Sequence, residues 1–303
     1  MGKPYSFVPL LGKKNYKVMD KELYRGKIKL KITTITPLYI ARAEIWEKDN
    51  KKLRKRFYQI NNKYLIPGSS LKGVVRTIAE SVSYSCIKTR QNRNMNMIKK
   101  EHVSNKKCNC IVCKTFGEMF YKSKVIFKDF VFKKGDTYTK CVPKLMNPHP
   151  EKGFYKENGK FKGVKFYYHG TNQSVENGSI PVEAMKPNSC FEGEVLFQEL
   201  DKEQLKLLCF SLGLDGSIQL KLGYNKPGYF GSCKVESMKA EIGKIKGLET
   251  IEKQFDAKEL ACQWGKQDDK ILDNINKLRE ILSYENARKI SDWQINENGQ
   301  KSY

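Results

Sequence analysis

The chain has 303 residues, enough to bury a substantial core as one decorated domain or as two small ones. Its 57 basic and 33 acidic residues give a formal charge of +24, which indicates a polyanionic partner, most simply a nucleic acid. No apolar run approaches the roughly 18 residues of a membrane-spanning helix, and the N-terminus lacks a signal-peptide core, so we expect a cytoplasmic protein without a membrane partner.

The first clear element is an alternating run at residues 27–32. Ile28, Leu30 and Ile32 share one face and three lysines share the other, which predicts a strand with one buried side and one basic side. The basic side is either an ordinary solvent-facing sheet surface or a surface for a nucleic-acid backbone.

Residues 33–63 form the predicted connection to the next element, and five of the six residues 51–56 are basic. Such a charge run is usually a solvated face or a disordered loop. Trp46, Phe57 and Tyr58 flank it, however, and aromatic rings beside cations are typical of single-stranded RNA binding. We therefore favour RNA contact in this loop.

An apolar run and a Pro-Gly turn at residues 64–68 lead into a helical pattern. The apolar residues that recur at helical spacing are Leu71, Val74, Val75, Ile78, Ala79 and Val82. Ser69 or Ser70 can cap the first turn of this helix. The positive end of the helix dipole, beside Lys72 and Arg76, then makes an anion site suited to phosphate. The alternative is an ordinary capped helix with two solvated basic residues.

The chain has nine cysteines. In a cytosolic chain of this length they argue for free thiols or metal ligands and against a disulfide framework. The candidate metal ligands are His102, Cys108, Cys110 and Cys113. Zinc prefers four nitrogen or sulfur ligands in tetrahedral geometry, and a closed four-ligand site is structural. Cys86 or Cys141 could replace His102 as the fourth ligand. Three reduced surface thiols are the alternative to a metal site.

Residues 124–130 predict the next strand, and residues 141–169 then turn loop-like, with three prolines and three glycines. The end of this loop mixes aromatic rings with Lys165 and His169. A lone histidine is more often structural than catalytic, so a structural role is the favoured interpretation of His169.

Residues 191–200 alternate and predict another strand, after which Asp201 and Gln204 give the spacing of a capping box for an amphipathic helix. A glycine-rich turn follows at residues 223–232. Such turns are common in hairpins, but this one also offers a lysine, three aromatic rings and glycines that permit close backbone approach. The C-terminal part is mostly helical by pattern.

Three of these stretches resemble, in the same order, the markers of one family. They are residues 67–73 (Pro-Gly-Ser-Ser-Leu-Lys-Gly), the cysteine cluster that ends in Phe116-Gly117, and the glycine-rich turn. They are similar to motifs of the CRISPR-associated RAMP superfamily, and more closely to those of the repeated backbone subunits of type III effector complexes. The resemblance covers roughly residues 27–236. One departure is Ala41-Arg42-Ala43, where the family usually has glycines.

The order of the predicted elements is close to a β-α-β-β-α-β plan. Together with the resemblance, it leads us to expect an α+β, ferredoxin-like (RRM-like) domain over residues 1–240. We expect two insertions in this domain, a zinc-bearing one at about residues 86–120 and a thumb-like, loop-rich one at about residues 140–175. Residues 241–303 would form a helical C-terminal addition.

The resemblance implies a guide-RNA-binding backbone subunit of a type III CRISPR antiviral effector complex. Its partners would be the guide RNA, the complementary target RNA and other effector subunits, with base pairing reading the target and the protein holding the guide backbone. The expected RNA-binding residues are Gly68, Ser69, Ser70, Lys72, Arg76, Lys165, Lys226, Gly228 and Tyr229. The alternatives are a guide-processing endoribonuclease of the same superfamily and a zinc-stabilised basic RNA-binding protein unrelated to defence.

Some members of the resembled family also cut the target RNA, with an aspartate in the loop between the first strand and the first helix. Asp49 is the only aspartate between Pro37 and Pro67, and Glu44 is the second candidate. A carboxylate here could act as a base on a ribose 2′-OH or hold Mg²⁺ or Mn²⁺. The alternative is that Asp49 only balances the nearby lysines.

Overall fold

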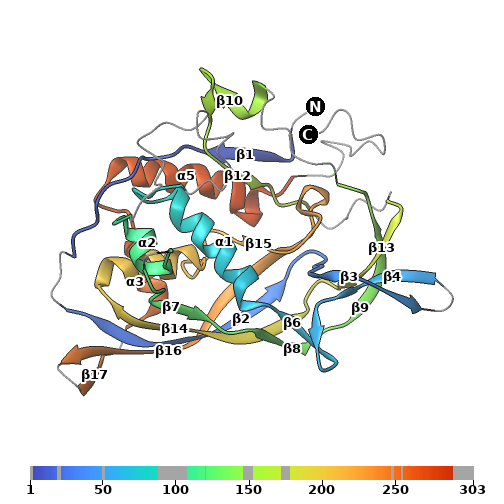
Figure 1. Ribbon diagram of the computed structural model, residues 1–303, viewed down its shortest axis with the longest axis horizontal. Helices are drawn as coiled ribbons and strands as arrows, with labels where there is room; N and C mark the ends of the chain where they lie inside the picture. The colour runs from blue at the N-terminus through green and yellow to red at the C-terminus, as the bar shows by residue number, and fades with distance from the viewer. Residues whose placement is uncertain are drawn as a thin grey trace.

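The computed structural model describes residues 3–18, 22–49, 52–87, 108–119, 121–145, 153–171, 178–246, 249–253 and 255–288. These residues form a mixed α+β protein in which α-helices pack on one side of a curled antiparallel sheet (Figure 1). Within these ranges, none of the helices has the length and the apolar composition needed to cross a membrane.

The centre of the sheet is β2 (Tyr24–Thr34), which pairs antiparallel with β14 (Cys190–Leu200) on one side and with β16 (Ser232–Lys246) on the other. The other strands of this sheet are β5 (Gln59–Ile60), β6 (Lys63–Ile66), β7 (Val125–Phe127), β8 (Phe130–Lys134), β15 (Leu220–Lys221) and β17 (Glu249–Lys253). The apolar side of residues 28–32 is fully buried beneath the helices, as the alternation predicts.

The opposite face of the sheet carries the three lysines of β2, with glutamates of the neighbouring strands beside them. Lys31 lies opposite Glu192 and Glu236 in the strand register. Lys27 makes an ion pair with Glu241 at 2.9 Å. Opposite charges on adjacent strands stabilise the pairing and cancel most of the local field. This arrangement favours an ordinary solvent-facing surface over a nucleic-acid surface.

Helix α1 (Gly68–Ser81) begins where the Pro-Gly turn predicts, but its cap differs from the prediction. No side chain of its own segment caps it, and Ser69 and Ser70 lie exposed in the first turn. The carboxylate of Asp129 instead accepts a hydrogen bond from the Gly68 backbone N–H at 2.8 Å. A distant carboxylate has taken the capping role, which leaves both serine hydroxyls at the surface.

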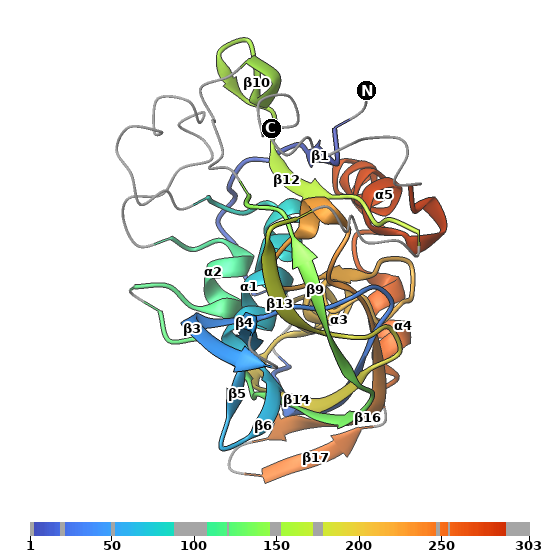
Figure 2. The same cartoon turned by 90° about the vertical axis from the view of Figure 1, so that its right-hand side faces the viewer.

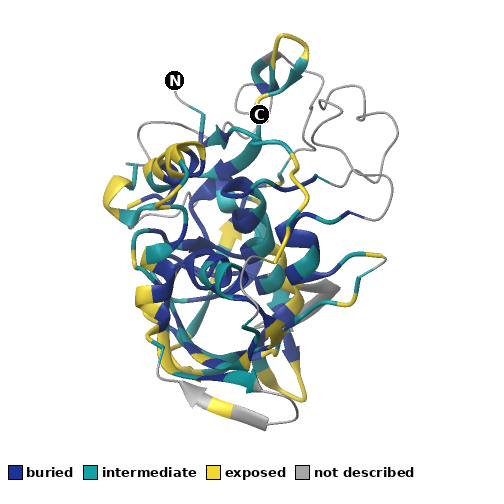
Figure 3. Cartoon of the chain, turned by 90° about the vertical axis from the view of Figure 1, so that its left-hand side faces the viewer, coloured by how far each residue is buried: buried dark blue, intermediate teal, exposed yellow. Residues whose placement is uncertain are grey.

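Four further helices pack beside α1 in the described part of the chain. They are α2 (Ile111–Phe116), α3 (Lys202–Ser211), α4 (Ala257–Gln263) and α5 (Asp269–Leu282), with short 3₁₀ segments η3 (Gly153–Tyr155), η4 (Lys226–Gly228) and η5 (Tyr284–Asn286). The predicted capping box of α3 is confirmed, because both reciprocal bonds between Asp201 and Gln204 are present. Figure 3 shows that the inner surfaces of the helices are buried.

The prediction of a loop at residues 33–63 is wrong for much of this range. Strands β3 (Ala41–Asp49) and β4 (Lys52–Phe57) form a hairpin that joins a second sheet. The other strands of that sheet are β13 (Ile180–Met185) and β9 (Thr137–Val142), in the order β3-β4-β13-β9.

The basic run forms strand β4 because of a residue on β13. This residue is Glu183, which is buried with 1% of its surface exposed. Its carboxylate accepts hydrogen bonds from the Phe57 backbone N–H at 3.1 Å and from the Tyr64 hydroxyl at 2.8 Å. It also pairs with Arg54 at 3.3 Å and with Arg56 at 3.9 Å. A carboxylate far away in the sequence therefore neutralises part of the basic run and lets it form a strand.

The second expected loop, residues 141–169, also contains strands. β12 (Val164–Tyr167) pairs with the N-terminal strand β1 (Tyr5–Val8), and both lie against α5 (Figures 1 and 2). β10 (Lys156–Glu157) and β11 (Lys160–Phe161) make a small hairpin that projects from the same end of the molecule.

The C-terminal helices share the core with the rest of the chain, and Asn274 of α5 shows how. Its side-chain amide donates to the backbone oxygens of Pro9 and Ser81, each at 2.7 Å. Asn274 is 3% exposed, so its loss would leave two carbonyl groups without a donor. This residue therefore ties α5 to the N-terminal segment and to the end of α1.

We predict that Asn274→Ala lowers the free energy of unfolding by about 1–3 kcal/mol, because buried carbonyl groups lose their hydrogen bonds. Asn276→Ala is the matched control, since Asn276 is exposed on the same helix. Urea denaturation followed by circular dichroism measures both values. Equal losses in the two variants would contradict the structural role of Asn274.

Candidate functional site

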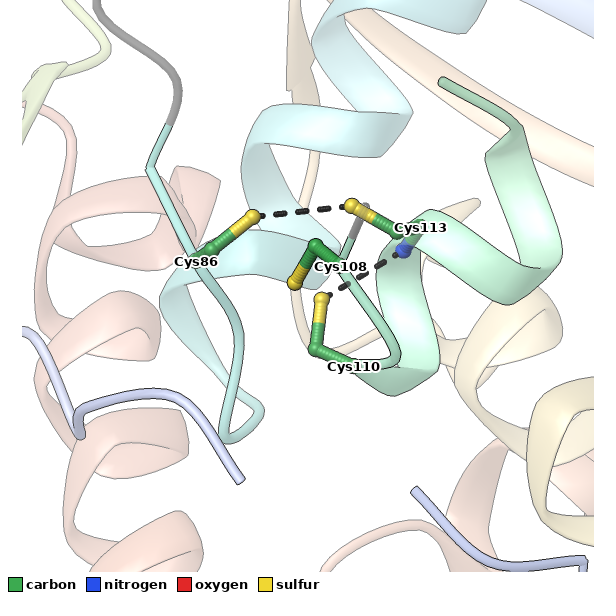
Figure 4. A group of neighbouring side chains, drawn as sticks. All are labelled: Cys86, Cys108, Cys110 and Cys113. Carbon is green, nitrogen blue, oxygen red and sulfur yellow. Dashed lines mark hydrogen bonds between the residues drawn. The ribbon is translucent and has the colours of Figure 1, made fainter. Parts of the chain in front are cut away.

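Four cysteines gather beside α1 and α2 (Figure 4). Cys86 comes from the segment after α1, while Cys108, Cys110 and Cys113 surround the start of α2. All four are buried, and their sulfur atoms lie within 4.8 Å of one another. His102 lies outside the described residues, and Cys141 is exposed and not part of the group. Cys86, the alternative fourth ligand, is thus the one that the fold brings to the other three.

The four thiols fit a zinc ion by number, chemistry and spacing. Tetrahedral zinc with Zn–S bonds of about 2.3 Å places its sulfur ligands about 3.8 Å apart. The sulfurs of Cys86 and Cys113 are 3.5 Å apart, close to this value. Hydrogen bonds to Cys113 and Cys86 lower the pKa of Cys110, whereas hydrogen bonds to Cys110 and Cys113 raise that of Cys86. Four sulfur ligands at this spacing make a closed set for a tetrahedral ion, and the buried cluster could hold a metal such as zinc.

Lys72 and Arg76 lie on the side of α1 that faces the cysteine-bearing segment. The Lys72 ammonium donates to the Ser123 hydroxyl at 2.8 Å. The Arg76 guanidinium donates to Glu80 and to the backbone oxygen of Gly117, both at 2.8 Å. These bonds tie α1 to the end of α2, so both cations already have protein partners.

A pocket of about 440 Å³ opens on another side of α1, and we call it the lysine pocket. Its lining residues are Ser69, Ser70, Gly73, Val74, Thr77 and Ile78 of α1, Lys165, Phe166 and Tyr167 of β12, Lys221 of β15, Lys226 of η4 and Leu282 of α5. Three lysines from separate segments thus meet the first turns of α1. Of the described residues that line the pocket, none is acidic.

The three lysines differ in their surroundings. The Lys165 ammonium lies 4.0 Å from the centre of the Tyr5 ring and donates to the Tyr155 hydroxyl at 3.1 Å. Burial, with a contribution from Lys3, lowers the pKa of Lys165 to about 8. Burial also lowers the pKa of Lys226, whose ammonium makes no hydrogen bond or ion pair with a described residue.

Lys221 is the most buried of the three, with 5% of its surface exposed. Its ammonium donates to the backbone oxygen of Phe230 at 3.0 Å and to the Ser232 hydroxyl at 3.2 Å. The same hydroxyl lies 2.8 Å from Nδ1 of His169. Burial, with repulsion from Lys226 opposed by attraction to Cys233, lowers the pKa of Lys221 to about 7. No sequence motif singled out Lys221, because its neighbours come from long-range packing.

His169 is fully buried beneath the pocket, and its Nε2 lies 3.1 Å from the Leu282 carbonyl oxygen. Burial, followed by repulsion from Lys221, lowers the pKa of His169 to about 3. It is therefore neutral at physiological pH and holds α5 against the glycine-rich turn. The structure favours the structural interpretation of this histidine.

The glycine-rich turn at residues 223–232 packs closely on the rest of the chain. Gly231 has φ +78° and would place a Cβ 1.8 Å from the Leu222 carbonyl oxygen, so only glycine fits there. Tyr229 is 2% exposed and Gly228 is buried, so the structure brings neither residue to the surface. Of the expected RNA-binding residues, Lys226 is the one that this turn presents to the lysine pocket.

The two candidate carboxylates lie on the β3–β4 hairpin. Asp49 is the last residue of β3 and pairs with Lys52 in the strand register, while Glu44 lies within β3. Their side chains fall outside the described part of the chain. Backbone geometry therefore places both residues on one hairpin.

We predict about one zinc ion per chain in purified protein, measured by elemental analysis. Cys86→Ser and Cys110→Ser should each lower the zinc content and the free energy of unfolding, because thiolate ligation is coupled to folding. Cys262→Ser, at an exposed cysteine outside the cluster, is the matched control. A fully folded preparation without metal would contradict this prediction.

Comparison with known proteins identifies the family. The model of the RAMP superfamily matches residues 31–234, more than half of the chain. The matched range includes α1, the cysteine cluster and the glycine-rich turn. No curated protein matches the chain. The chain belongs to the RAMP superfamily and has the CRISPR-associated RNA-binding function of that family.

Proposed function

We propose that this protein is a guide-RNA-binding backbone subunit of a type III CRISPR antiviral effector complex. The observation that carries the proposal is the meeting of exposed serines on α1 with Lys165, Lys221 and Lys226 in a pocket whose described lining has no acidic residue. Lysines concentrated beside a helix N-terminus attract phosphate groups, and phosphate contacts supply most of the affinity for a nucleic-acid backbone. Guide RNA, paired target RNA and other effector subunits would be its partners.

The sheet order supports a ferredoxin-like core. The neighbours β16-β2-β14-β8 are all antiparallel. α1 connects β2 with β7 and β8 through intervening segments, and α3 connects β14 with β16. This order and these two helices fit a β-α-β-β-α-β plan.

The two insertions keep their proposed positions in this scheme. The zinc-bearing one contains α2, and the thumb-like one contains the projecting β10–β11 hairpin. We propose a structural role for the zinc, because the four thiols leave no open coordination position.

The proposed RNA path runs over the first turn of α1 and the glycine-rich turn. Ser69 and Ser70 are exposed there, and Lys226 has no described partner to compete with a phosphate. Lys72 and Arg76 remain proposed contacts on the neighbouring side of the helix, where they would have to bind RNA in addition to their protein partners. Gly68, Gly228 and Tyr229 would act indirectly, by shaping the backbone beneath the RNA.

We predict that Lys226→Ala weakens binding of any single-stranded RNA and reduces the slope of log K against log salt by about 0.7, the value for one phosphate contact. Lys258→Ala, which removes the same charge at an exposed position of α4, should leave the slope unchanged. Fluorescence anisotropy at several salt concentrations measures both. A loss that depends on RNA sequence, or a fixed slope, would contradict a backbone contact. The Lys72→Ala/Arg76→Ala variant tests those two cations in the same way.

Cleavage of the target is a second part of the proposal, assigned to Asp49 with Glu44 next. In the assembled complex with Mg²⁺ or Mn²⁺, Asp49→Asn should abolish target cleavage and leave guide binding intact, because it removes a charge while keeping the size of the side chain. Gel analysis of a labelled target measures the products. An intact target with the wild-type complex would make this subunit a scaffold, and normal cleavage by Asp49→Asn would transfer the test to Glu44.

A further inference from the structure

Another cavity lies at one end of the main sheet, where β16, β2, β14 and β7 run side by side (Figure 1). We call it the sheet groove, and its volume is about 510 Å³. Ile126 and Leu196 contribute apolar surface to its lining, while Arg25 and Lys124 contribute positive charge. Ile126 leaves 53% of its surface exposed there. Exposed apolar surface bordered by polar residues is typical of an interaction site.

The strand register places the apolar side chains of the groove on the outer face of the sheet. Leu196 lies opposite both Lys27 and Ile126. Residues that lie opposite each other on antiparallel strands share a face, and Lys27 points away from its buried neighbour Ile28. The helices, with the lysine pocket among them, cover the other face (Figure 1). A ligand in the groove would therefore not compete with RNA on α1.

The charge pattern of this face changes at the groove. The three lysines of β2 lie opposite glutamates of the neighbouring strands, namely Glu192, Glu194, Glu236 and Glu241. Arg25 comes next on the same face of β2, but its register partner on β16 is Gly243, which has no side chain. Arg25 is exposed and makes no hydrogen bond or ion pair with a described residue.

The other charged residues of the lining do not neutralise Arg25. Glu241 already pairs with Lys27 at 2.9 Å and with Lys239 at 3.0 Å. The Lys124 ammonium donates to the backbone oxygen of Glu199. The groove thus combines apolar surface with an excess of positive charge, so the complementary ligand is both apolar and acidic.

We propose that the sheet groove docks a segment of a different protein subunit, one that carries a carboxylate next to a large apolar side chain. The carboxylate would pair with Arg25, whose guanidinium can bind it through two parallel hydrogen bonds, and Lys124 would add to the attraction. The apolar side chain would cover Ile126 and Leu196, which gives the apolar centre and polar rim of a protein interface. This inference adds a protein-docking site to the proposed function and does not depend on the lysine pocket.

The surroundings favour a protein segment over other acidic ligands. The glutamates on the rest of the outer face would repel the phosphates of an RNA strand. A small molecule is bound best by a cavity that encloses about 70–90% of its surface, whereas this groove lies on a sheet face that the helices leave uncovered. A protein segment can extend beyond the groove and gain further contacts along the same face.

The first experiment identifies the occupant in the native assembly. Ile126 of the tagged chain is replaced by the photocrosslinking residue p-benzoyl-L-phenylalanine in the native cells, and irradiated complexes are analysed by mass spectrometry. We expect a crosslink to one defined peptide of a different subunit, with an aspartate or glutamate beside a large apolar residue. The same replacement of Leu272, which is 36% exposed on α5, is the control and should not capture this peptide. A crosslink to RNA, to a second copy of this chain or to no molecule would overturn the proposal.

The second experiment tests the chemistry of docking. Arg25→Glu and Ile126→Asp change exposed positions, so both variants should fold. Each should lower recovery of the crosslinked subunit with the tagged chain about tenfold, because like charges meet or a charge faces apolar surface. Lys258→Glu and Leu272→Asp are the matched controls and should recover it as the wild type does. Replacing the crosslinked carboxylate by arginine should restore recovery with Arg25→Glu, which a folding defect would not allow.

Binding of hexauridylate, a short single-stranded RNA, separates this proposal from the RNA-binding function. Arg25→Glu and Ile126→Asp should bind it with wild-type affinity, because the groove lies on the other face of the sheet. Unchanged recovery of the subunit in both variants would overturn the docking site and leave RNA binding standing. Absence of hexauridylate binding by the wild type would instead contradict the RNA-binding function and leave the docking site standing.

Discussion

The docking of the glycine-rich turn on residues 37–39, which follow β2, is the contact on which the proposed RNA-binding side depends. Backbone N–H groups of Gly231 and Tyr224 donate to the carbonyl oxygens of Pro37 and Tyr39, both at 2.8 Å. Gly223 has φ +74°, and a Cβ there would lie 2.2 Å from the Tyr39 carbonyl oxygen, so the approach depends on glycine. This contact fixes β15 and η4, and with them the ammonium groups of Lys221 and Lys226, beneath the first turns of α1.

Helix α1 has different surroundings on two of its sides. On one side, Arg76 and the cysteine cluster join it to α2, so ligation of a metal would stiffen the helix. On the other side, the described lining of the lysine pocket contains three lysines and no acidic residue. The strongly basic composition is therefore not spread evenly, because glutamates balance the lysines on the outer face of the sheet.

Local sequence patterns predicted the helices and strands that are determined by residues close together in the sequence. The alternation at residues 28–32, the helix after the Pro-Gly turn and the capping box of Asp201 all rest on neighbours within a few residues, and the structure has each of them. The β3–β4 hairpin was missed because its basic run is neutralised by Glu183, more than a hundred residues away. Lys221 and the approach of Cys86 to the other three cysteines likewise depend on tertiary packing, which spacing alone does not contain.

The central claim is that this chain holds a guide RNA within a larger assembly, and the RNA that co-purifies with it tests that claim most directly. The assembly would be isolated from its native cells through a tag on this chain, and its RNA would be sized and sequenced. The account predicts small RNA of fixed length in a multi-subunit complex. Heterogeneous RNA bound to the chain alone, or no RNA, would contradict it.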